Sequence, residues 1–321
     1  MSAVEDPMSS TDSAMTLPVL SEQTRLLVVA PHPDDETIAT GLLIQQVRAA
    51  GGTVRILLLT AGDNNPWPQR WLERRMTIRG TDRQRWGDRR HAEILQALQQ
   101  LDVSRQALEE LGLPDMGVTD QLLQSGSDAV TAMASAIRRF QPSLVAMPAL
   151  DDHHPDHGAA HVLVQLALTG QAEPPQRLTY LVHGRPGSHE YVEIHGSVEQ
   201  QKKKMDALAM HRSQMALSGN RMRRLAARPE RYARLTMRSV KPSSALPWQP
   251  PAWLRPWLRL SVISEAGARS WRWRDAPLQR DNRGVYHLLP SAGADGAVRF
   301  ARLAWDLHTF WIFDRWGWRE L

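Results

Sequence analysis

The chain contains no cysteine among its 321 residues. This absence excludes disulfide bonds, thiolate metal ligands and a cysteine nucleophile. Any bound metal ion would therefore need histidine and carboxylate ligands. Lysine is also scarce, since only four of the 39 basic side chains are lysine and the rest are arginine.

Long apolar runs are missing as well. No stretch approaches the roughly 18 consecutive apolar residues that indicate a membrane-spanning helix. The opening segment, MSAVEDPMSSTDSAM, has acidic side chains where a secretory signal has basic ones, and it has no apolar centre. We therefore expect no signal peptide, a disordered tail over residues 1–22, and a protein in the cytoplasm or at the inner face of a membrane.

The composition is otherwise that of a globular protein, but it changes along the chain. Hydrophobic residues make up 42% of the sequence, which is enough for a large core. Residues 1–211 carry 19 basic and 26 acidic side chains, whereas residues 212–321 carry 20 and 8. Nine of the 12 tryptophans follow residue 247. This change predicts one domain over residues 23–218 and a basic, tryptophan-rich extension over residues 219–321.

A cluster of polar side chains follows the first apolar run of the domain. The run Arg25–Ala30 is typical of a buried parallel strand, and an amphipathic helix is predicted from Thr37. Between them lie His32, Asp34, Asp35 and Glu36, with a proline on each side of the histidine. Carboxylates before a helix often serve only as caps, but this alternative does not explain the histidine. Because sites in open α/β sheets form at the carboxyl ends of strands, we expect a site here.

A second cluster repeats the order of the first. The predicted strand Leu144–Pro148 leads into the segment DDHHPDH at residues 151–157, and an apolar helix follows over Gly158–Leu168. A single histidine cluster on a surface is often only solvated. Two clusters, each at the carboxyl end of a predicted strand, argue for one shared site.

Predicted strands and helices alternate between the two clusters. Further strands are expected at Thr53–Thr60 and Ala107–Leu113, and further helices at residues 37–50, 89–101 and 127–140. This alternation predicts an α/β fold with a doubly wound sheet. The polar stretch over residues 61–88 is predicted to be a long loop, either a lid over the site or a plain surface insertion.

Several motifs resemble those of one enzyme family. ProHisProAspAspGlu at 31–36 and HisProAspHis at 154–157 resemble the two signature motifs of PIG-L/LmbE-type zinc deacetylases, which act on N-acetylglucosaminyl compounds. ArgHisAlaGlu at 90–93, LeuProAsp at 113–115 and the segment 204–214 resemble further motifs of that family. The resemblance covers about residues 24–215 and implies a Rossmann-like, mainly parallel sheet.

The resemblance also implies roles for the clustered residues. His32, Asp35 and His157 would bind Zn²⁺, with Fe²⁺ as an alternative metal, and would leave positions open for water and substrate. Asp34 would be the general base on the metal-bound water. His154 would stabilise the tetrahedral oxyanion.

Three more residues receive supporting roles from the resemblance. Arg90 and Asp115 would contact the substrate, and Asp156 would orient a ligating histidine from behind. Two histidines and one carboxylate are also the ligand set of non-haem Fe(II) oxygenases. We favour a hydrolase because those oxygenases usually have β-barrel scaffolds, not parallel strands.

These observations lead to one predicted function and one alternative. The predicted function is removal of the acetyl group from an N-acetylglucosamine-type sugar, such as a cell-envelope glycan or a lipopolysaccharide core precursor. The alternative is a non-catalytic protein that binds a glycan or a membrane surface and has a structural metal site. A base beside an open metal site argues against the alternative.

The extension is predicted to be rich in β-strands and to supply a binding surface. Short strands are expected at Trp257–Ile263, Ser270–Arg274, Gly284–Leu289, Ala297–Leu303 and Phe310–Phe313. Tryptophan and arginine alternate in this region, which favours contact with an anionic glycan or a membrane surface. Core packing with arginine outside is the simpler alternative. Nucleic acid is a less favoured partner because no nucleic-acid-binding motif is present.

The remaining polar features are expected to be structural. For His161 and His183, a core or surface role is favoured over the alternative that they line the pocket, and His211 is interpreted as a structural hydrogen-bonding residue. The lysines at residues 202–204 are interpreted as a solvated helix face, and helical spacing is seen over residues 221–238.

Overall fold

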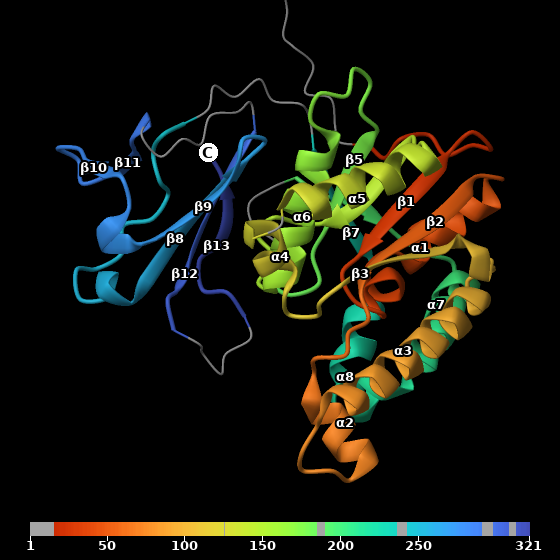
Figure 1. The fold of residues 1–321 in the computed structure, drawn as a ribbon. Coiled ribbons are helices and arrows are strands. Elements are labelled where there is room, and N and C mark those ends of the chain that lie inside the picture. The colour runs from red at the N-terminus through yellow and green to blue at the C-terminus, as the bar shows by residue number, and fades with distance from the viewer. Residues whose placement is uncertain (1–15, 125, 185–189, 236–242, 291–297, 308–312) are drawn as a thin grey trace, which may run out of the picture.

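The computed structural model describes residues 16–321 except residue 125 and residues 185–189, 236–242, 291–297 and 308–312. Figure 1 shows a large sheet with helices beside a smaller, blue-coloured sheet formed by the end of the chain. Residues 1–15, which make up most of the predicted tail, lie outside the described residues. Leu17 and Leu20, near the end of that tail, are partly buried against the core.

The large sheet has seven strands in the order β3-β2-β1-β4-β5-β7-β6. The strands are β1 Arg25–Ala30, β2 Thr53–Thr60, β3 Leu108–Leu113, β4 Leu144–Pro148, β5 Gln176–Tyr180, β6 Val192–Ile194 and β7 Glu230–Leu235. The first five strands in this order all run parallel to one another. The sixth strand, β7, is antiparallel to both β5 and β6. The predicted mainly parallel α/β sheet is confirmed.

Helices cover both faces of this sheet. They are α1 Asp35–Ala49, α2 Pro66–Glu73, α3 Gly80–Gln100, α4 Val118–Gln124, α5 Gly126–Phe140, α6 Pro155–Leu168, α7 Val198–Met210 and α8 Arg212–Ala226. A short 3-10 helix, η1 Arg105–Ala107, precedes β3. Within the described residues, no helix is both long and apolar enough to cross a bilayer.

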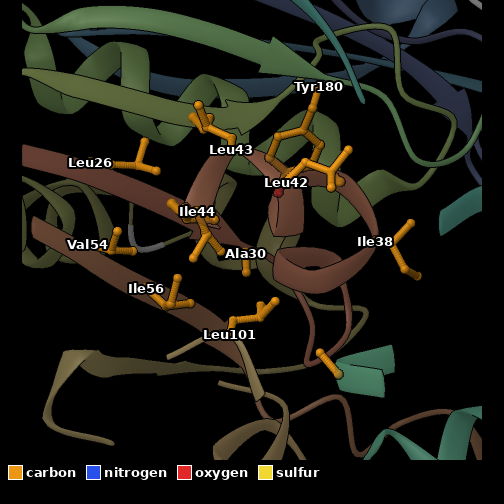
Figure 2. Packing of buried hydrophobic residues seen from close by; sticks show 14 of the residues in the cluster. Leu26, Ala30, Ile38, Leu42, Leu43, Ile44, Val54, Ile56, Leu101 and Tyr180 are labelled. Atoms are coloured by element: carbon orange, nitrogen blue, oxygen red, sulfur yellow. The ribbon is translucent and has the colours of Figure 1, made fainter. Parts of the chain in front are cut away.

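Alternate side chains of each strand enter two separate cores. In β1, Leu26 and Val28 pack with the helices α1, α3, α7 and α8, while Leu27 and Val29 pack with α4, α5 and α6. Figure 2 shows the first core, where Leu43 of α1 and Tyr180 of β5 lie close to the strands. Burial on both faces explains why β1 has a nearly continuous apolar sequence, and it confirms the doubly wound arrangement.

The prediction of a long loop over residues 61–88 is wrong. This stretch contains α2 and the first part of α3. Asn65 caps α2 by accepting the N–H of Trp67 at 3.4 Å, and proline occupies the first helical position. Asp82, in the first turn of α3, accepts the N–H of Arg79 at 2.9 Å. Much of the surface of these helices is exposed, and their sequences are rich in arginine and other polar residues, which made the stretch resemble a loop.

The helical spacing over residues 221–238 holds only as far as Ala226, where α8 ends. The next element is not a continuation of the helix but the strand β7, which belongs to the large sheet. The predicted boundary between residues 218 and 219 falls inside α8. The division of the chain into two parts therefore stays a prediction.

The C-terminal extension is rich in β-strands, as predicted. Four antiparallel strands have the order β13-β12-β8-β9, and β10 pairs with β11. The elements are η2 Arg255–Trp257, β8 Leu258–Ser264, β9 Gly267–Arg272, η3 Trp273–Asp275, β10 Leu278–Arg280, β11 Tyr286–Leu288, β12 Arg299–Trp305 and β13 Gly317–Glu320. The strand expected at Phe310–Phe313 lies outside the described residues apart from Phe313.

The extension packs directly on the helices of the large domain. Ile263, Phe300 and Trp318 are buried in the same core as α4, α5 and α6. Gly158, in α6, allows the closest approach, because a Cβ atom there would lie 2.9 Å from Cδ1 of Trp318. The extension is therefore joined to the domain through a shared apolar core.

A buried ion pair connects α7 with β7, although the lysines at residues 202–204 were expected to be solvated. That expectation is wrong for Lys204, which is fully buried with its Nζ 2.6 Å from Oε1 of Glu230. The Glu230 carboxylate also accepts the N–H groups of Leu42 and Leu43 and the hydroxyl of Tyr232. One carboxylate thus holds α1, α7 and β7 together.

Replacement of this lysine should destabilise the fold. Lys204→Met would leave the Glu230 carboxylate buried without its cation, which should lower the free energy of unfolding by about 3–5 kcal/mol. The control is Lys203→Met, because Lys203 forms an exposed pair with Asp102 that should contribute no more than about 1 kcal/mol. Urea unfolding measures both, and equal effects of the two variants would contradict this account.

Candidate metal centre and active site

The two polar clusters meet because β1 and β4 are neighbours in the sheet. These strands pair in parallel from Leu26 with Leu144 to Val28 with Ala146. Their carboxyl ends lie side by side, and the chain continues from β1 to β2 on one side and from β4 to β5 on the other. Such a switch point leaves a crevice at the carboxyl ends of the strands, where α/β proteins bind ligands.

Four histidine rings gather at this crevice. The ring centre of His32 lies 4.6 Å from that of His154 and 5.5 Å from that of His157. His183, which follows β5, lies 5.1 Å from His157 and 5.5 Å from His154. Because β5 was not predicted, the sequence analysis favoured a core or surface role for His183 over the pocket-lining alternative.

Asp35 connects the two clusters. Its Oδ2 atom lies 3.3 Å from Nδ1 of His32 and 3.2 Å from Nε2 of His157. Both ring nitrogens of His157 are buried and meet no hydrogen-bond criterion, although a carboxylate oxygen lies 3.2 Å from each, Asp35 at Nε2 and Asp152 at Nδ1. A buried imidazole nitrogen without a hydrogen bond is expensive, and a metal ion is a natural partner for it.

Candidate ligand atoms within 4.8 Å of one another form three overlapping groups in the described residues. The groups are His32 with His154 and His157, Asp35 with His157 and His183, and His32 with Asp115 and Asp156. A metal centre of histidine and aspartate is therefore plausible on geometry. The expected ligands His32, Asp35 and His157 are spread over these groups, so this ligand set stays a prediction.

Asp152 supports the second cluster from behind. Its Oδ2 atom lies 3.2 Å from Nδ1 of His157 and accepts the N–H groups of Val182 and His183. Its Oδ1 atom accepts the N–H of His154 at 3.0 Å. The sequence analysis assigned no role to Asp152. The missing signal was again β5, since two of these donors follow that strand.

Asp156 and Asp115 both lie against His32. Oδ2 of the fully buried Asp156 and Oδ1 of Asp115 are each 3.3 Å from Nε2 of His32. Burial alone would lower the pKa of His32, but hydrogen bonds to Asp115, Asp156 and Asp35 raise it well above 6.5. Asp156 also accepts the N–H of Met116 at 2.7 Å. It therefore has the position expected for orienting a histidine, although that role is untested.

Arg90 is engaged by the protein itself. Its guanidinium is buried and donates to the carbonyl oxygens of Gly62 and Pro33, which belong to the loops after β2 and β1. Its Nη2 atom also lies 3.6 Å from Oδ2 of Asp34. The Asp115 carboxylate similarly accepts the N–H of Asn64 at 2.6 Å. Contact of Arg90 or Asp115 with a substrate stays a prediction.

Asp34 has an unusual backbone and an altered acidity. Its φ angle is 125°, a value that costs a residue other than glycine roughly 1–3 kcal/mol. Burial raises the pKa of Asp34 to about 6, while Arg90 acts in the opposite direction. Strain of this kind persists only where the surroundings enforce it, and here it sets the backbone of Asp34 apart from that of the neighbouring Asp35.

Glu36 and His211 enforce that backbone. Oε2 of Glu36 accepts the N–H of Asp34 at 2.9 Å. Oε1 of Glu36 accepts the hydroxyl of Thr37 at 2.6 Å and lies 3.0 Å from Nε2 of His211. His211 is buried at the junction of α7 and α8, which confirms its expected structural hydrogen-bonding role.

His154 is held as a neutral donor. Its Nδ1 atom accepts the N–H of Asp156 at 3.3 Å, so the proton of the neutral ring is assigned to Nε2. Burial lowers the pKa of His154 well below 6.5, and the neighbouring His32 and His157 lower it further. The ring can therefore donate one hydrogen bond to a developing oxyanion without carrying a charge itself.

Comparison with known proteins agrees with this geometry. Residues 27–168 match the family described as PIG-L: GlcNAc-PI de-N-acetylase. Over 153 residues the chain is 32% identical to the 1D-myo-inositol 2-acetamido-2-deoxy-alpha-D-glucopyranoside deacetylase of Mycobacterium avium (strain 104), and the match covers 43% of this chain and 49% of that relative. The chain thus spans about half the length of the curated relatives that it matches most strongly.

Solved structures support the fold. A deacetylase of the teicoplanin biosynthetic pathway aligns with a TM-score of 0.51 at 18% identity, covering 67% of this chain and 100% of that one. The N,N'-diacetylchitobiose deacetylase of Pyrococcus horikoshii aligns with a TM-score of 0.50 at 19% identity, covering 66% and 84%. At these identities the likeness concerns the fold alone. The segment that carries both histidine clusters, residues 27–168, is the part of the chain that matches the PIG-L family.

Proposed function

We propose that the protein is a metal-dependent hydrolase that removes the acetyl group from an N-acetylglucosamine-type sugar. One observation carries this proposal. Asp34, which has a strained backbone and a raised pKa, lies next to buried histidine and aspartate side chains that could bind a metal ion and next to a neutral His154. The name of the Mycobacterium avium relative supports a 2-acetamido sugar as the substrate class. A cell-envelope glycan or a lipopolysaccharide core precursor is the larger substrate that we propose.

The donor set fits Zn²⁺, with Fe²⁺ as an alternative. The chain has no thiolate, and the buried Nε2 atom of His157 lies 3.2 Å from the carboxylate of Asp35. His32, Asp35 and His157 would hold the ion as two nitrogen ligands and one oxygen ligand. A divalent cation at this position supplies polarisation of the amide carbonyl and lowers the pKa of water to about 7.

The chain's own residues then handle the protons and the developing charge. Asp34, with a pKa of about 6, is mostly ionised at neutral pH and can take a proton from the attacking water. The Nε2–H of His154 donates to the amide oxygen as it becomes negative. The proton held by Asp34 is then available to the departing nitrogen. The products are acetate and a free amino sugar.

The non-catalytic alternative explains less of this site. A structural metal centre needs ligands but has no use for a strained aspartate beside them. In Asp34 the backbone strain is maintained by a dedicated hydrogen bond from its N–H to Glu36. We therefore place the catalytic proposal first.

Metal content tests the ligand set. We expect one Zn²⁺ or Fe²⁺ per chain, and His157→Ala should remove it because the two remaining ligands bind a divalent ion weakly. His153→Ala is the matched control, since this exposed histidine lies in the same turn. Elemental analysis measures both proteins, and a full metal complement in His157→Ala would show that the ligand set is wrong.

Kinetic measurements can distinguish the proposed base, Asp34, and the proposed oxyanion donor, His154, from the metal ligands. Asp34→Asn should keep the metal and lose turnover by about 10²–10⁴-fold, the usual contribution of a general base. His154→Ala should also keep the metal and lose turnover by roughly 10²–10³-fold. Acetate release from an N-acetylglucosaminide is the measurement, with the exposed carboxylate variant Asp120→Asn as control. Wild-type turnover by Asp34→Asn would refute the mechanism.

We also propose that the extension contacts an anionic part of a larger glycan. Trp253 and Trp257 support this, because they are 73% and 51% exposed and have Arg255 between them in the sequence. The arginines of the region have internal partners, since Arg255 donates to the carbonyl oxygen of Pro250, and Arg259 and Arg272 both bind Asp306. The candidate surface is therefore narrower than the alternating sequence pattern indicated.

Loss of the two exposed tryptophans should weaken binding of an anionic oligosaccharide. In Trp253→Ala/Trp257→Ala, affinity for a hyaluronan oligosaccharide should fall roughly thirtyfold, because each truncation at a binding surface costs on the order of 1 kcal/mol. The matched control is Trp67→Ala/Trp71→Ala, which removes two equally exposed rings from α2. Titration calorimetry at low salt gives both affinities. Unchanged affinity in Trp253→Ala/Trp257→Ala would contradict the proposal and would indicate that the extension has only a structural role.

A further inference from the structure

The helix α2 presents large apolar side chains to solvent. Trp67 and Trp71 are 63% and 66% exposed, and Met76, just after the helix, is 88% exposed. The two tryptophans are four residues apart, so they lie on the same side of the helix. Pro68 and Gln69 form the buried side. Apolar groups gathered in this way usually mark an interaction surface.

Arginines surround these apolar side chains. The only carboxylates between residues 66 and 85 are Glu73 and Asp82, and Arg85 binds both of them. Asp82 also pairs with Arg75. Among the ion pairs of the described residues, none includes the remaining arginines of this stretch, which are Arg70, Arg74, Arg79 and Arg83. Arg70 contacts Trp67, and Arg74 and Arg79 are exposed in the turn that follows α2.

Together these side chains form what we term the α2 patch: Trp67, Arg70, Trp71, Leu72, Arg74, Met76 and Arg79. Arg70 lies over the ring of Trp67, 5.1 Å from its centre, so charge and aromatic surface are combined. Figure 1 shows α2 at the lower end of the molecule, where the turn from α2 to α3 projects outward. The patch is thus free to meet a flat surface.

The α2 patch is also connected to the crevice with the histidines. Asn64 donates its N–H and its side-chain amide to Asp115, which lies against His32. The next residue, Asn65, is the N-cap of α2. Only the short segment before α2 separates this helix from the candidate site. A surface that binds α2 would therefore lie close to the site along the chain.

We propose that the α2 patch docks on the surface of a bilayer that contains anionic lipids. Tryptophan favours the level of the lipid head groups, and arginine is attracted to their negative charge. A short helix with both features fits the geometry of an interfacial anchor. A second copy of this chain is a poorer occupant, because the uncompensated arginines of two facing patches would repel each other. The docking does not depend on what reaction the site performs.

Vesicle co-sedimentation of the full chain tests this proposal. The protein should bind vesicles of phosphatidylcholine with phosphatidylglycerol, bind vesicles of phosphatidylcholine alone at least tenfold more weakly, and dissociate as salt rises. Because an arginine near an anionic surface contributes about fivefold to partitioning, Arg74→Gln/Arg79→Gln should weaken binding roughly 25-fold. Trp67→Ala/Trp71→Ala should weaken it at least tenfold.

Matched controls change the same residue types on the extension. Arg269→Gln/Arg283→Gln and Trp253→Ala/Trp257→Ala alter exposed side chains there, and each should leave vesicle binding within twofold of wild type. If Trp67→Ala/Trp71→Ala failed to fold by circular dichroism, the arginine variant would carry the test alone.

Three results would overturn the proposal. The first is no binding of the wild type to the anionic vesicles. The second is equal loss of binding in the α2 variants and in their controls on the extension, which would indicate general electrostatic attraction. The third is a wild-type dimer that becomes a monomer when Trp67 and Trp71 are replaced, measured by light scattering, which would make a second copy the occupant.

Discussion

The site depends on the parallel pairing of β1 with β4. The two polar clusters are more than a hundred residues apart in the sequence, and this pairing alone places their turns side by side. Both strands are buried on both faces, so their register is fixed by apolar packing with little freedom to slip. Asp35 and His157 can approach to 3.2 Å only because that register is maintained.

The helices α7 and α8 support this arrangement from one side of the sheet. Through Lys204 and Glu230, α7 is tied to the middle of α1 and to β7. Through His211 and Glu36, the junction of the two helices is tied to the start of α1 and to the backbone of Asp34. Both connections are buried and polar, so each has a strict geometry. The stability of the fold and the position of the proposed base thus share the same elements.

The sequence predicted β1, β2 and β4 to their end residues, because strands buried on both faces have distinct apolar runs with clear ends. It did not predict β5, which begins with Gln176 and Arg177, polar residues that lie near the edge of the parallel part. Because of that omission, a pocket position for His183 was the less favoured alternative and Asp152 received no role, although the two residues are hydrogen-bonded at the end of β5. The loop predicted in place of α2 concealed the exposed patch in the same way, since that helix is short and exposes its tryptophans instead of burying them.

The proposed mechanism depends on which side chains bind the metal ion. The most direct measurement is a crystal structure of the zinc-loaded protein with anomalous scattering recorded at the zinc edge. We expect one anomalous peak about 2.0–2.2 Å from nitrogen atoms of His32 and His157 and from an oxygen of Asp35, with Asp34 and His154 outside bonding distance. A peak bound instead by His32, Asp115 and Asp156, one of the three candidate groups in the described residues, would contradict the proposed division between ligands, base and oxyanion donor.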